Sequence, residues 1–289
     1  MKILTFDFED WFHLLDNEAT ASVAGWKNFP SRLGKGMHAL LNMLDRHDQK
    51  ATFFILGWVA DNYPSLVKEI SARGHHIGSH SYSHQLVYRQ TPQEFRDDLA
   101  KSKDIIEGII GRPIDSYRAP GFSIVSESLW AFEIIADLGF KLDSSVFPAA
   151  RSHGGIVEFP YAEPCIGLLG SSDLRLFPLN SRQVFGKSFV YSGGGYFRLC
   201  PEFLLKYWFK RDNYVMTYFH PRDFDPDQPV APGLGYFRYF KSYVGLSGAL
   251  HKLEKLIRDH EFVALDDADR LVDWSKAKTV NLLNSGKHI

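Results

Sequence analysis

The sequence predicts an α/β fold in which parallel strands are joined by helices, and three observations support this. The chain has 289 residues, of which 45% are hydrophobic, so it can bury a large core in one domain or two. Strand and helix patterns alternate up to about residue 145, which is typical of helical crossovers between parallel strands. The alternation returns after about residue 200, beyond a stretch rich in Gly, Ser and Pro.

The first half of the chain contains four short apolar runs that are expected to form strands, with amphipathic segments between them. The expected strands are residues 2–8, 51–56, 76–78 and 140–142, and the expected helices are residues 34–47, 64–73, 91–110 and 126–138. Pro64 stands in the first turn of the second helix and Gly74 follows its end. Thr91 and Glu94 have the spacing of a capping box at the start of the third.

The second half is less regular. Residues 146–200 are predicted to be an irregular elaboration with short β-like runs at 156–159, 174–177 and 189–191. Regular structure then returns as a helix at 201–210, a strand at 214–219, a long helix with an apolar stripe from Tyr243 to Ile257, and a last strand at 262–265. Because no internal repeat or linker is visible, a single domain over residues 1–289 is expected.

Composition argues against several classes of protein. The 33 Lys+Arg and 34 Asp+Glu give a net charge of -1, so we expect no nucleic-acid partner. Cys165 and Cys200 form no Cys-x-x-Cys pair, so neither a disulfide framework nor a thiolate zinc site is expected. There is no apolar run of about 18 residues that would predict a transmembrane helix. Acids interrupt the apolar start of the chain, which is unlike a secretion signal, and a cytoplasmic location is expected.

Three acids, Asp7, Glu9 and Asp10, stand at the end of the first expected strand. In parallel α/β folds the carboxyl ends of the strands share one face, so functional residues should follow strands immediately. Carboxylates at such a place are costly to desolvate unless they bind a cation or transfer protons. A solvated turn with helix caps is the alternative, and for these three residues alone it is the more ordinary interpretation.

His80 and His84 directly follow the expected strand at 76–78. Two imidazoles four residues apart can bind one metal ion if the segment is helical or tightly turned, and the serines around them can fix the rings. A polar loop is the alternative interpretation. Together with an acid from the first strand end, two His form a common set for a divalent metal that leaves positions open for water and substrate.

Two further segments place charged groups beside turns. Arg118 can hold a carboxylate through two hydrogen bonds, and the Pro120-Gly121 turn after it can present backbone N–H groups to a developing oxyanion. His220 ends the expected strand at 214–219, where it could act as a general acid. Alone, these would be an ordinary turn and a structural histidine. The other histidines, His13 among them, are assigned no role.

In this order and spacing, the motifs resemble those of the polysaccharide deacetylase family, also called the NodB-homology or carbohydrate esterase 4 family. The motifs are Asp7-Phe8-Glu9-Asp10, His80-Ser81-Tyr82-Ser83-His84, Arg118-Ala119-Pro120-Gly121 and Phe219-His220-Pro221, within residues 3–224. The chain is still more similar to a branch found in bacterial surface-polysaccharide biosynthesis clusters. That likeness rests on Asp-Phe-Glu-Asp-Trp-Phe at 7–12, Gly-Gly-Gly-Tyr-Phe-Arg at 193–198 and His-Pro-Arg-Asp-Phe-Asp-Pro at 220–226.

The resemblance implies a distorted (β/α)7 barrel with a β-rich middle insertion. It also implies a hydrolase of non-peptide C–N bonds that removes the acetyl group from an N-acetylated sugar. Asp7 would be the general base, oriented by Arg118, and His220 would protonate the leaving amine. His80, His84 and one acid of the first motif would hold a divalent metal, zinc first, with Co²⁺, Ni²⁺, Mn²⁺ or Fe²⁺ as alternatives.

Two assignments stay open at this stage. Strand alternation puts Glu9 on the same side as Asp7, which slightly favours Glu9 as the metal ligand, whereas Asp10 becomes the ligand if the strand has already ended. The acid that steadies His220 is either Asp143 or Asp223.

The substrate is defined only by class. A backbone N–H near Gly121 and Phe122 would bind the oxyanion, and Tyr196 could form a wall against the sugar or part of a packed hairpin. The expected substrate is a surface polysaccharide or its lipid-linked or nucleotide-linked precursor, and the sequence does not predict an oligomeric state. The alternatives are another amide hydrolase, acting on ureides or cyclic amides, and an inactive carbohydrate-binding protein on the same scaffold.

Overall fold

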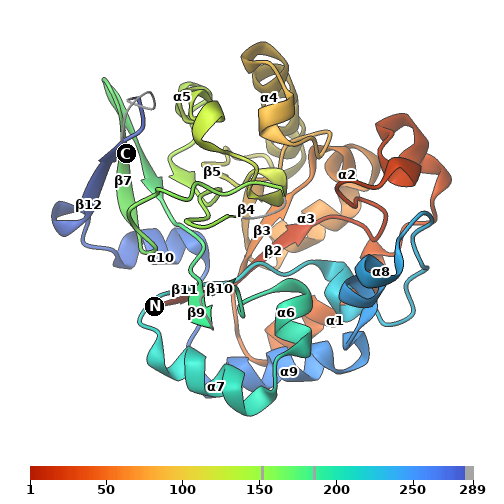
Figure 1. Ribbon diagram of the computed structural model, residues 1–289. Coiled ribbons are helices and arrows are strands. Elements are labelled where there is room, and N and C mark those ends of the chain that lie inside the picture. Colours follow the sequence, from red (N-terminus) through yellow and green to blue (C-terminus); the bar gives the residue numbers. More distant parts are fainter. Residues whose placement is uncertain (151–152, 185–186, 284–289) are drawn as a thin grey trace.

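The core of the protein is a mostly parallel sheet that curls into a distorted barrel. The computed structural model describes residues 1–150, 153–184 and 187–283 (Figure 1). The main sheet consists of β2 (Thr5–Phe8), β3 (Thr52–Ile55), β4 (His76–Ser79), β5 (Ser116–Tyr117), β6 (Leu142–Asp143), β7 (Cys165–Leu169), β8 (Ser172–Leu176) and β12 (Lys278–Asn281). Its order is β12-β7-β8-β6-β5-β4-β3-β2. Neighbouring strands are parallel throughout, except for the antiparallel pair of β7 and β8.

The remaining strands form two small sheets of two strands each. They pair β1 (Lys2–Ile3) in parallel with β11 (Val215–Met216), and β9 (Arg182–Val184) with the antiparallel β10 (Lys187–Phe189). The parallel pairing continues beyond β11, because Phe6 of β2 forms a bridge with Phe219. On the far side of β11, the Met216 amide donates to the Asn180 side chain at 2.9 Å. Among the described residues no backbone ladder joins β11 to β8, so side chains close the barrel at this point.

Helices surround the barrel. They are α1 (Leu33–Arg46), α2 (Gly57–Asn62), α3 (Pro64–Ala72), α4 (Pro92–Ile110), α5 (Trp130–Asp137), α6 (Gly194–Leu199), α7 (Glu202–Arg211), α8 (Tyr236–Tyr243), α9 (Leu246–Asp259) and α10 (Leu265–Leu271). Figure 1 shows α1, α7 and α9 below the strands and α4 and α5 above them. Within the described residues, no helix combines the length and apolarity needed to cross a bilayer.

Local sequence signals explain the helices that support the site. Thr91 and Glu94 form the expected capping box at the start of α4, and Gly111 ends the helix with φ 70°. Such a left-handed C-cap favours glycine because it has no Cβ. The buried residues of α4 include Phe95 and Ile106, which form its inner face.

Two expected strands are wrong. Residues 156–159 form turns, although Ile156 and Phe159 are buried. At 262–265 only an isolated bridge joins Val263 to Ile3, and the chain enters α10 at Leu265. The last strand is instead β12 at 278–281. Both expected strands were apolar runs that pack into the core without forming a ladder.

The parallel strands bring the candidate residues to one end of the barrel. Glu9 directly follows β2, His80 follows β4, and Arg118 follows β5. His220 follows the stretch that pairs with β2 and begins the turn η6 (Pro221–Phe224). The expectation that functional residues follow strands immediately therefore agrees with the arrangement of these four side chains.

Gly36 of α1 touches the backbone of η6, the turn that follows His220. A Cβ at position 36 would lie 2.6 Å from the Pro221 carbonyl oxygen. Gly34, two residues earlier in the same helix, has room, because a Cβ there would meet His38 Cε1 at 4.0 Å. The two positions therefore form a matched pair in which only one substitution displaces η6.

We expect Gly36→Ala to lower the free energy of unfolding by about 1–3 kcal/mol, because the added methyl group forces two backbones apart. Gly34→Ala should raise it by up to about 1 kcal/mol, because alanine favours the helix. Urea unfolding of both variants and the wild type measures the difference. Equal stability of the two variants would show that η6 can move away from the added methyl group at no energetic cost.

Candidate functional site

Arg118 lies in the interior of the barrel and is fully buried. Its Nη1 donates to Asp7 Oδ1 at 2.8 Å and to Thr5 Oγ1 at 2.7 Å, and its Nη2 donates to Ser144 Oγ at 2.9 Å. The guanidinium carbon is 4.3 Å from the centre of the Phe54 ring. These contacts hold one oxygen of Asp7 and leave Oδ2 on the side of His220, whose Nε2 is 3.9 Å away.

The Asp7 carboxylate is held in its ionised form. Burial alone would raise its pKa, but the charges of Arg118, His80 and His220 outweigh this effect and lower the pKa below its ordinary value. Asp7 is only 3% exposed. At neutral pH such a buried carboxylate is unprotonated, so it can accept a proton from a group in the cleft.

Glu9, His80 and His84 meet beside Asp7. Each offers one ligand atom, these atoms all lie within 4.8 Å of one another, and all three residues are buried. His84 Nε2 lies 2.5 Å from Glu9 Oε2, yet Oε2 has no hydrogen-bond partner among the described residues. Two imidazole nitrogens and a carboxylate form a donor set that suits zinc and similar divalent ions.

The protonation of His80 suits metal binding. Its Nδ1 is 2.7 Å from the Arg118 carbonyl oxygen, so Nδ1 carries the hydrogen and Nε2 presents its lone pair. Burial lowers the pKa of His80 to about 4, although the charge of Asp7 opposes this effect. The imidazole is therefore neutral at pH 7, as a metal ligand must be. Burial raises the pKa of Glu9, but His84 and the other nearby histidines lower it by a larger amount. Glu9 is therefore ionised.

A tight turn, rather than a helix, brings the two histidines together. Ser81 and His84 have positive φ angles of 64° and 54°, a conformation that non-glycine residues rarely adopt. The Asp98 carboxylate holds this turn by accepting hydrogen bonds from the Tyr82 amide at 2.7 Å and the Ser83 amide at 3.0 Å. The His-x-x-x-His spacing therefore works here through local backbone strain that Asp98 helps to stabilise.

Asp10 does not lie with the candidate metal ligands but accepts hydrogen bonds from the backbone. Its carboxylate accepts the backbone amides of Trp11 at 2.8 Å and Arg32 at 3.1 Å. These contacts lie next to the start of α1, at Leu33. Burial raises the pKa of Asp10, which these hydrogen bonds partly offset. Of the two acids left open, Glu9 is the one that lies with His80 and His84.

His220 is steadied by Asp223. His220 Nδ1 is 3.2 Å from Asp223 Oδ2, and its Nε2 points toward Asp7 and lies 3.3 Å from Glu9 Oε1. Asp223 also forms a buried ion pair with Arg198. Arg198 in turn donates to the backbone carbonyls of residues 241, 242 and 244 at the carboxyl end of α8. Burial lowers the pKa of His220 from its ordinary value, although Glu9 and Asp7 oppose the effect.

Asp143, the alternative partner considered for His220, does not contact it and bonds to Ser145 instead. Its carboxylate accepts the Ser145 amide at 2.8 Å and the Ser145 hydroxyl at 2.7 Å. Asp143 is fully buried, and burial raises its pKa to about 7. It stabilises the loop after β6, from which Ser144 contacts Arg118, and it acts on the site only through that loop.

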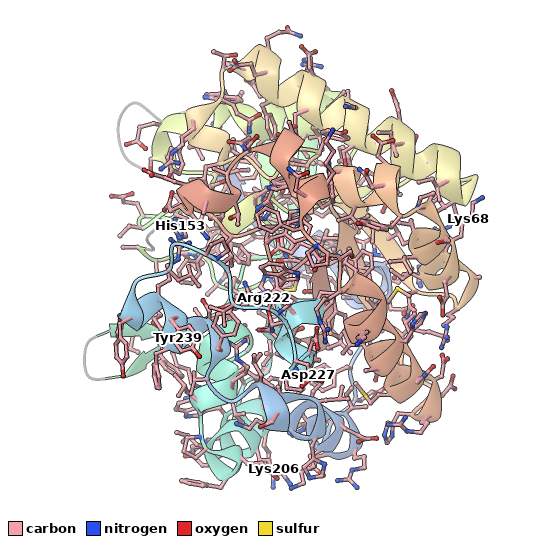
Figure 2. The ribbon with its side chains drawn as sticks, turned by 90° about the vertical axis from the view of Figure 1, so that its right-hand side faces the viewer. Lys68, His153, Lys206, Arg222, Asp227 and Tyr239 are labelled. Atoms are coloured by element: carbon pink, nitrogen blue, oxygen red, sulfur yellow. The ribbon has the colours of Figure 1, made fainter. Side chains whose placement is uncertain are left out.

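These groups open into a cleft with a cavity of about 240 Å³. Its lining includes the charged and titratable groups Asp7, Glu9, His80, His84 and His220, together with Gly121, Phe122, Gly194, Gly195 and Tyr218. Figure 2 labels two more lining residues, His153 and Arg222. Gly121 and Phe122 are therefore at the cleft, as expected. The Phe122 amide donates to the Ala119 carbonyl at 3.0 Å within the turn.

The expectation that Tyr196 forms a wall against the sugar or part of a hairpin is also corrected. The motif at 193–198 forms α6, not a hairpin, and helical geometry turns the Tyr196 ring toward Phe189, with ring centres 4.8 Å apart. The ring is not part of the cleft lining, which Gly194, Gly195 and Tyr218 provide instead. The phase of this unexpected helix decides which residues of the motif face the cleft.

His13, which was assigned no role from the sequence, lines the cleft and is 2% exposed. His13 Nδ1 accepts the Asp10 amide at 2.9 Å, so the hydrogen of the neutral ring is on Nε2. This Nε2 is buried and has no hydrogen-bond partner among the described residues. It can donate to a ligand but cannot bind a metal in this tautomer. Its position three residues after Asp10 was the available signal.

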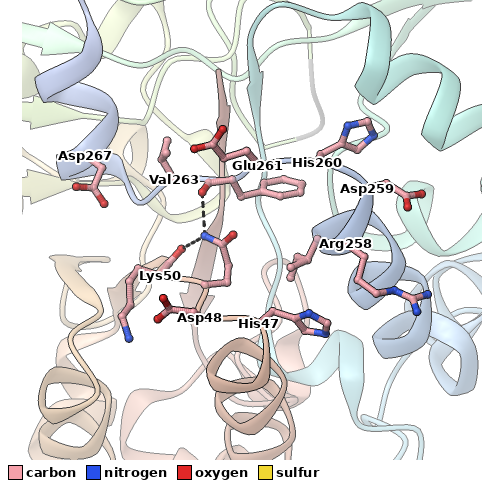
Figure 3. Close-up of a pocket in the computed structure, with 12 residues that line it drawn as sticks. His47, Asp48, Lys50, Arg258, Asp259, His260, Glu261, Val263 and Asp267 are labelled. Atoms are coloured by element: carbon pink, nitrogen blue, oxygen red, sulfur yellow. Dashed lines mark hydrogen bonds between the residues drawn. The ribbon is translucent and has the colours of Figure 1, made fainter.

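A larger cavity of about 690 Å³ lies at the other end of the barrel, beyond the carboxyl ends of α1 and α9 (Figure 3). Its lining mixes charges of both signs, such as Lys50 and Arg258 with Asp48 and Asp267. Gln49 fastens this region by donating to the Phe262 carbonyl at 3.0 Å. The amino-terminal face of parallel strands usually serves stability, and the converging acid, base and ligand groups lie at the opposite face.

Comparison with known proteins agrees with this arrangement. Residues 28–142 match the polysaccharide deacetylase family, and residues 144–270 match a domain of unknown function (DUF3473). A peptidoglycan-N-acetylglucosamine deacetylase of Bacillus cereus is 37% identical over 95 residues, which are 32% of this chain and 34% of that protein. The chain thus spans about a third of the length of that relative. Strands from both matched segments belong to the main sheet, and the single-domain expectation stays a prediction.

Two solved structures share the fold. A Mycobacterium smegmatis protein assigned as a polysaccharide deacetylase has a TM-score of 0.64 at 17% identity and covers 96% of this chain and 93% of its own. A CE4 family pseudoenzyme from Bacillus anthracis has a TM-score of 0.50 at 14% identity, covering 96% of this chain and 66% of its own. The expected distorted α/β barrel is confirmed, whereas fold alone does not distinguish active from inactive members.

The raised pKa of Asp143 predicts a pH-dependent stability. The folded pKa of about 7 lies above the ordinary value of 3.8, so between these values the folded chain keeps a proton that the unfolded chain releases. The stability of the wild type should therefore fall as pH rises through this window. Asp143→Asn cannot ionise, so from about pH 5 to about pH 8 it should lose less free energy of unfolding, by up to about 3 kcal/mol.

Urea unfolding at the two pH values measures this difference. Asp173→Asn, at an exposed position of β8, is the matched control and should follow the wild type. Identical pH dependence in Asp143→Asn and the wild type would mean that Asp143 is ionised throughout in the folded chain.

Proposed function

We propose that this chain, whose residues 28–142 match the polysaccharide deacetylase family, is a metal-dependent hydrolase that deacetylates an N-acetylated sugar. The observation that supports this most directly is the convergence of Glu9, His80 and His84 within 4.8 Å. An ionised acid and a histidine flank these ligands in the same cleft. Sugar binding alone would require neither a ligand set of this kind nor a proton acceptor and donor.

Glu9, His80 and His84 would hold the metal, with Zn²⁺ the first candidate and Co²⁺, Ni²⁺, Mn²⁺ or Fe²⁺ the alternatives. Such an ion, when bound, supplies Lewis-acid chemistry that polarises an acetyl carbonyl and makes water easier to deprotonate. The neutral state of His80 and the ionised state of Glu9 mean that neither residue must lose a proton before binding.

Asp7 would be the general base. Its Oδ2 accepts a proton from the water whose oxygen adds to the acetyl carbon, while Arg118 holds Oδ1 in place. Arg118 also keeps the pKa of Asp7 low, so this carboxylate is available over a wide pH range. The turn at Gly121 borders the same cleft, where a backbone N–H would stabilise the oxyanion that develops from the acetyl carbonyl.

His220 would be the general acid. As the bond between the acetyl carbon and the nitrogen breaks, Nε2 gives a proton to the amine, and acetate and the free amino sugar leave. Asp223 at Nδ1 stabilises the protonated ring, and Arg198 fixes Asp223 from the other side. Because His220 Nε2 lies 3.9 Å from Asp7 Oδ2, the proton taken from water can return to the leaving group within the site.

The substrate we propose is an N-acetylhexosamine in a surface polysaccharide or in a lipid-linked or nucleotide-linked precursor. Another amide hydrolase is the second candidate, because the first motif places Glu9 two residues after Asp7 and thereby alters the usual acid pair. An inactive binder is the third, since the same fold includes a pseudoenzyme.

Acetate release from a panel of N-acetylhexosamine glycans tests the proposal. The purified protein should release acetate, lose this activity in the presence of a chelator and regain it with added Zn²⁺. Hydrolysis of a ureide without acetate release would favour the second candidate. Metal binding without hydrolysis of any amide would favour the third.

Two substitutions should separate the base from the metal ligands. We expect Asp7→Asn to keep its metal but to lose about 10²–10⁴-fold in kcat, because the proton acceptor is gone. His84→Ala should lose both the metal and the activity, because one of three ligands is missing. Metal content per chain and kcat are measured side by side, with thermal unfolding as a check on folding. An Asp7→Asn variant that retains wild-type turnover would exclude Asp7 as the base.

A further inference from the structure

The cleft contains more positive charge than its acids can pair. Asp7 is paired with Arg118, Asp223 with Arg198 and His220, and Glu9 lies against His84. Three further cations line the same cavity: Arg222, Arg238 and Lys241. Within the described part of the chain, none of these three has an acidic partner at ion-pair distance.

Arg222 is the most informative of the three, because it is half-buried and incompletely bonded. It comes from η6, two residues after His220, and its Nη2 is buried with no hydrogen-bond partner in the part of the chain that the structure describes. The guanidinium carbon lies 5.7 Å from the centre of the Tyr243 ring. Burial lowers the pKa of Arg222, although Tyr243 and Glu9 oppose the effect, and an arginine remains cationic at neutral pH.

A buried N–H of a cation is costly to leave unpaired, so the arrangement at Arg222 favours a partner that arrives with the ligand. A neutral hydroxyl could accept a hydrogen bond there but would leave the charge uncompensated. The nearby acids do not fill this role, because Glu9 belongs to the candidate metal site and Asp10 caps the start of α1. A divalent cation at Glu9, His80 and His84 would make the cleft still more positive.

Arg238 and Lys241 of α8 extend this charge along the cleft. Arg238 is held in place by donating to the backbone carbonyls of Leu15 and Asp16, which satisfies its N–H groups without neutralising its charge. The Lys241 ammonium lies 5.3 Å from the centre of the Phe237 ring and 5.9 Å from that of Tyr196. The three cations therefore line the same cavity as the candidate catalytic groups, and their exposure ranges from the half-buried Arg222 to the exposed Lys241.

We propose that the sugar substrate carries an anionic group next to the N-acetyl group that is hydrolysed, and that Arg222, with Arg238 and Lys241, binds this group. The anion is a carboxylate on the sugar itself or a phosphate in the linkage that joins it to a carrier. Arg222 offers the planar N–H edge that suits both groups. This inference rests on the proposed deacetylase function and names the class of sugar that it acts on.

Three N-acetylated substrates test the inference: a neutral N-acetylglucosamine oligosaccharide, a glycan that contains N-acetylmuramic acid, and UDP-N-acetylglucosamine. The wild type should prefer at least one anionic substrate over the neutral one by about 10-fold in kcat/KM, which is the order expected of one charge-assisted hydrogen bond. The preference should weaken at high salt. A preferred muramic glycan assigns the anion to the sugar, and a preferred nucleotide sugar assigns it to the linkage.

Variants at Arg222 then show whether this residue is responsible. Arg222→Met should remove most of the preference, and Arg222→Lys should keep part of it, because lysine keeps the charge but not the planar edge. Arg46→Met is the control, because Arg46 is exposed and pairs with Glu254 on the outside of the barrel, so it should keep the wild-type preference. Thermal unfolding checks that each variant is folded.

Two results would overturn the inference: a wild type that prefers the neutral oligosaccharide, or an Arg222→Met variant in which kcat/KM falls equally for all three substrates. Failure of the proposed function is distinguishable from this. If no substrate is hydrolysed, equilibrium binding of the same three compounds to the metal-loaded protein still measures the preference. Binding that does not distinguish neutral from anionic sugars would then exclude the anion site as well.

Discussion

The buried ion pair between Arg118 and Asp7 is the interaction on which the rest of the site depends. Through its side chain, Arg118 joins β2, by way of Thr5 and Asp7, to Ser144 after β6. Through its carbonyl it orients the imidazole of His80. One residue thus fixes both a candidate proton acceptor and a candidate metal ligand. Removing either partner would leave an uncompensated charge inside the barrel, which costs about 3–5 kcal/mol.

The sequence predicted much of this arrangement because it depends on strand ends. A parallel sheet places every residue that follows a strand on the same face, so Glu9, His80, Arg118 and His220 could be grouped without knowledge of side-chain positions. Strand alternation also favoured Glu9 over Asp10, and Glu9 is the acid that lies with the histidines. These inferences need only the period of a strand and the direction of the chain.

Other parts of the site depend on features that leave no periodic signal. The choice between Asp143 and Asp223 depends on η6, a short turn that folds Asp223 back onto His220. The outward direction of Tyr196 depends on the phase of α6, which was not expected. His13 was missed because only the burial of its ring shows that its Nε2 has no hydrogen-bond partner among the described residues. The wrong strands at 156–159 and 262–265 have the same cause, since apolar runs predict burial more reliably than pairing.

The turn η6 links the candidate proton donor to the proposed recognition of the substrate. It begins after His220, contains Arg222 and Asp223, and rests on the backbone contact with Gly36 of α1. Asp223 is neutralised by Arg198, so it steadies His220 without cancelling the charge of Arg222. An anion bound at Arg222 would therefore lie close to the imidazole that serves the leaving amine and would favour its protonated form. Because burial lowers the pKa of His220, the bound substrate would itself help to restore the proton that the amine needs.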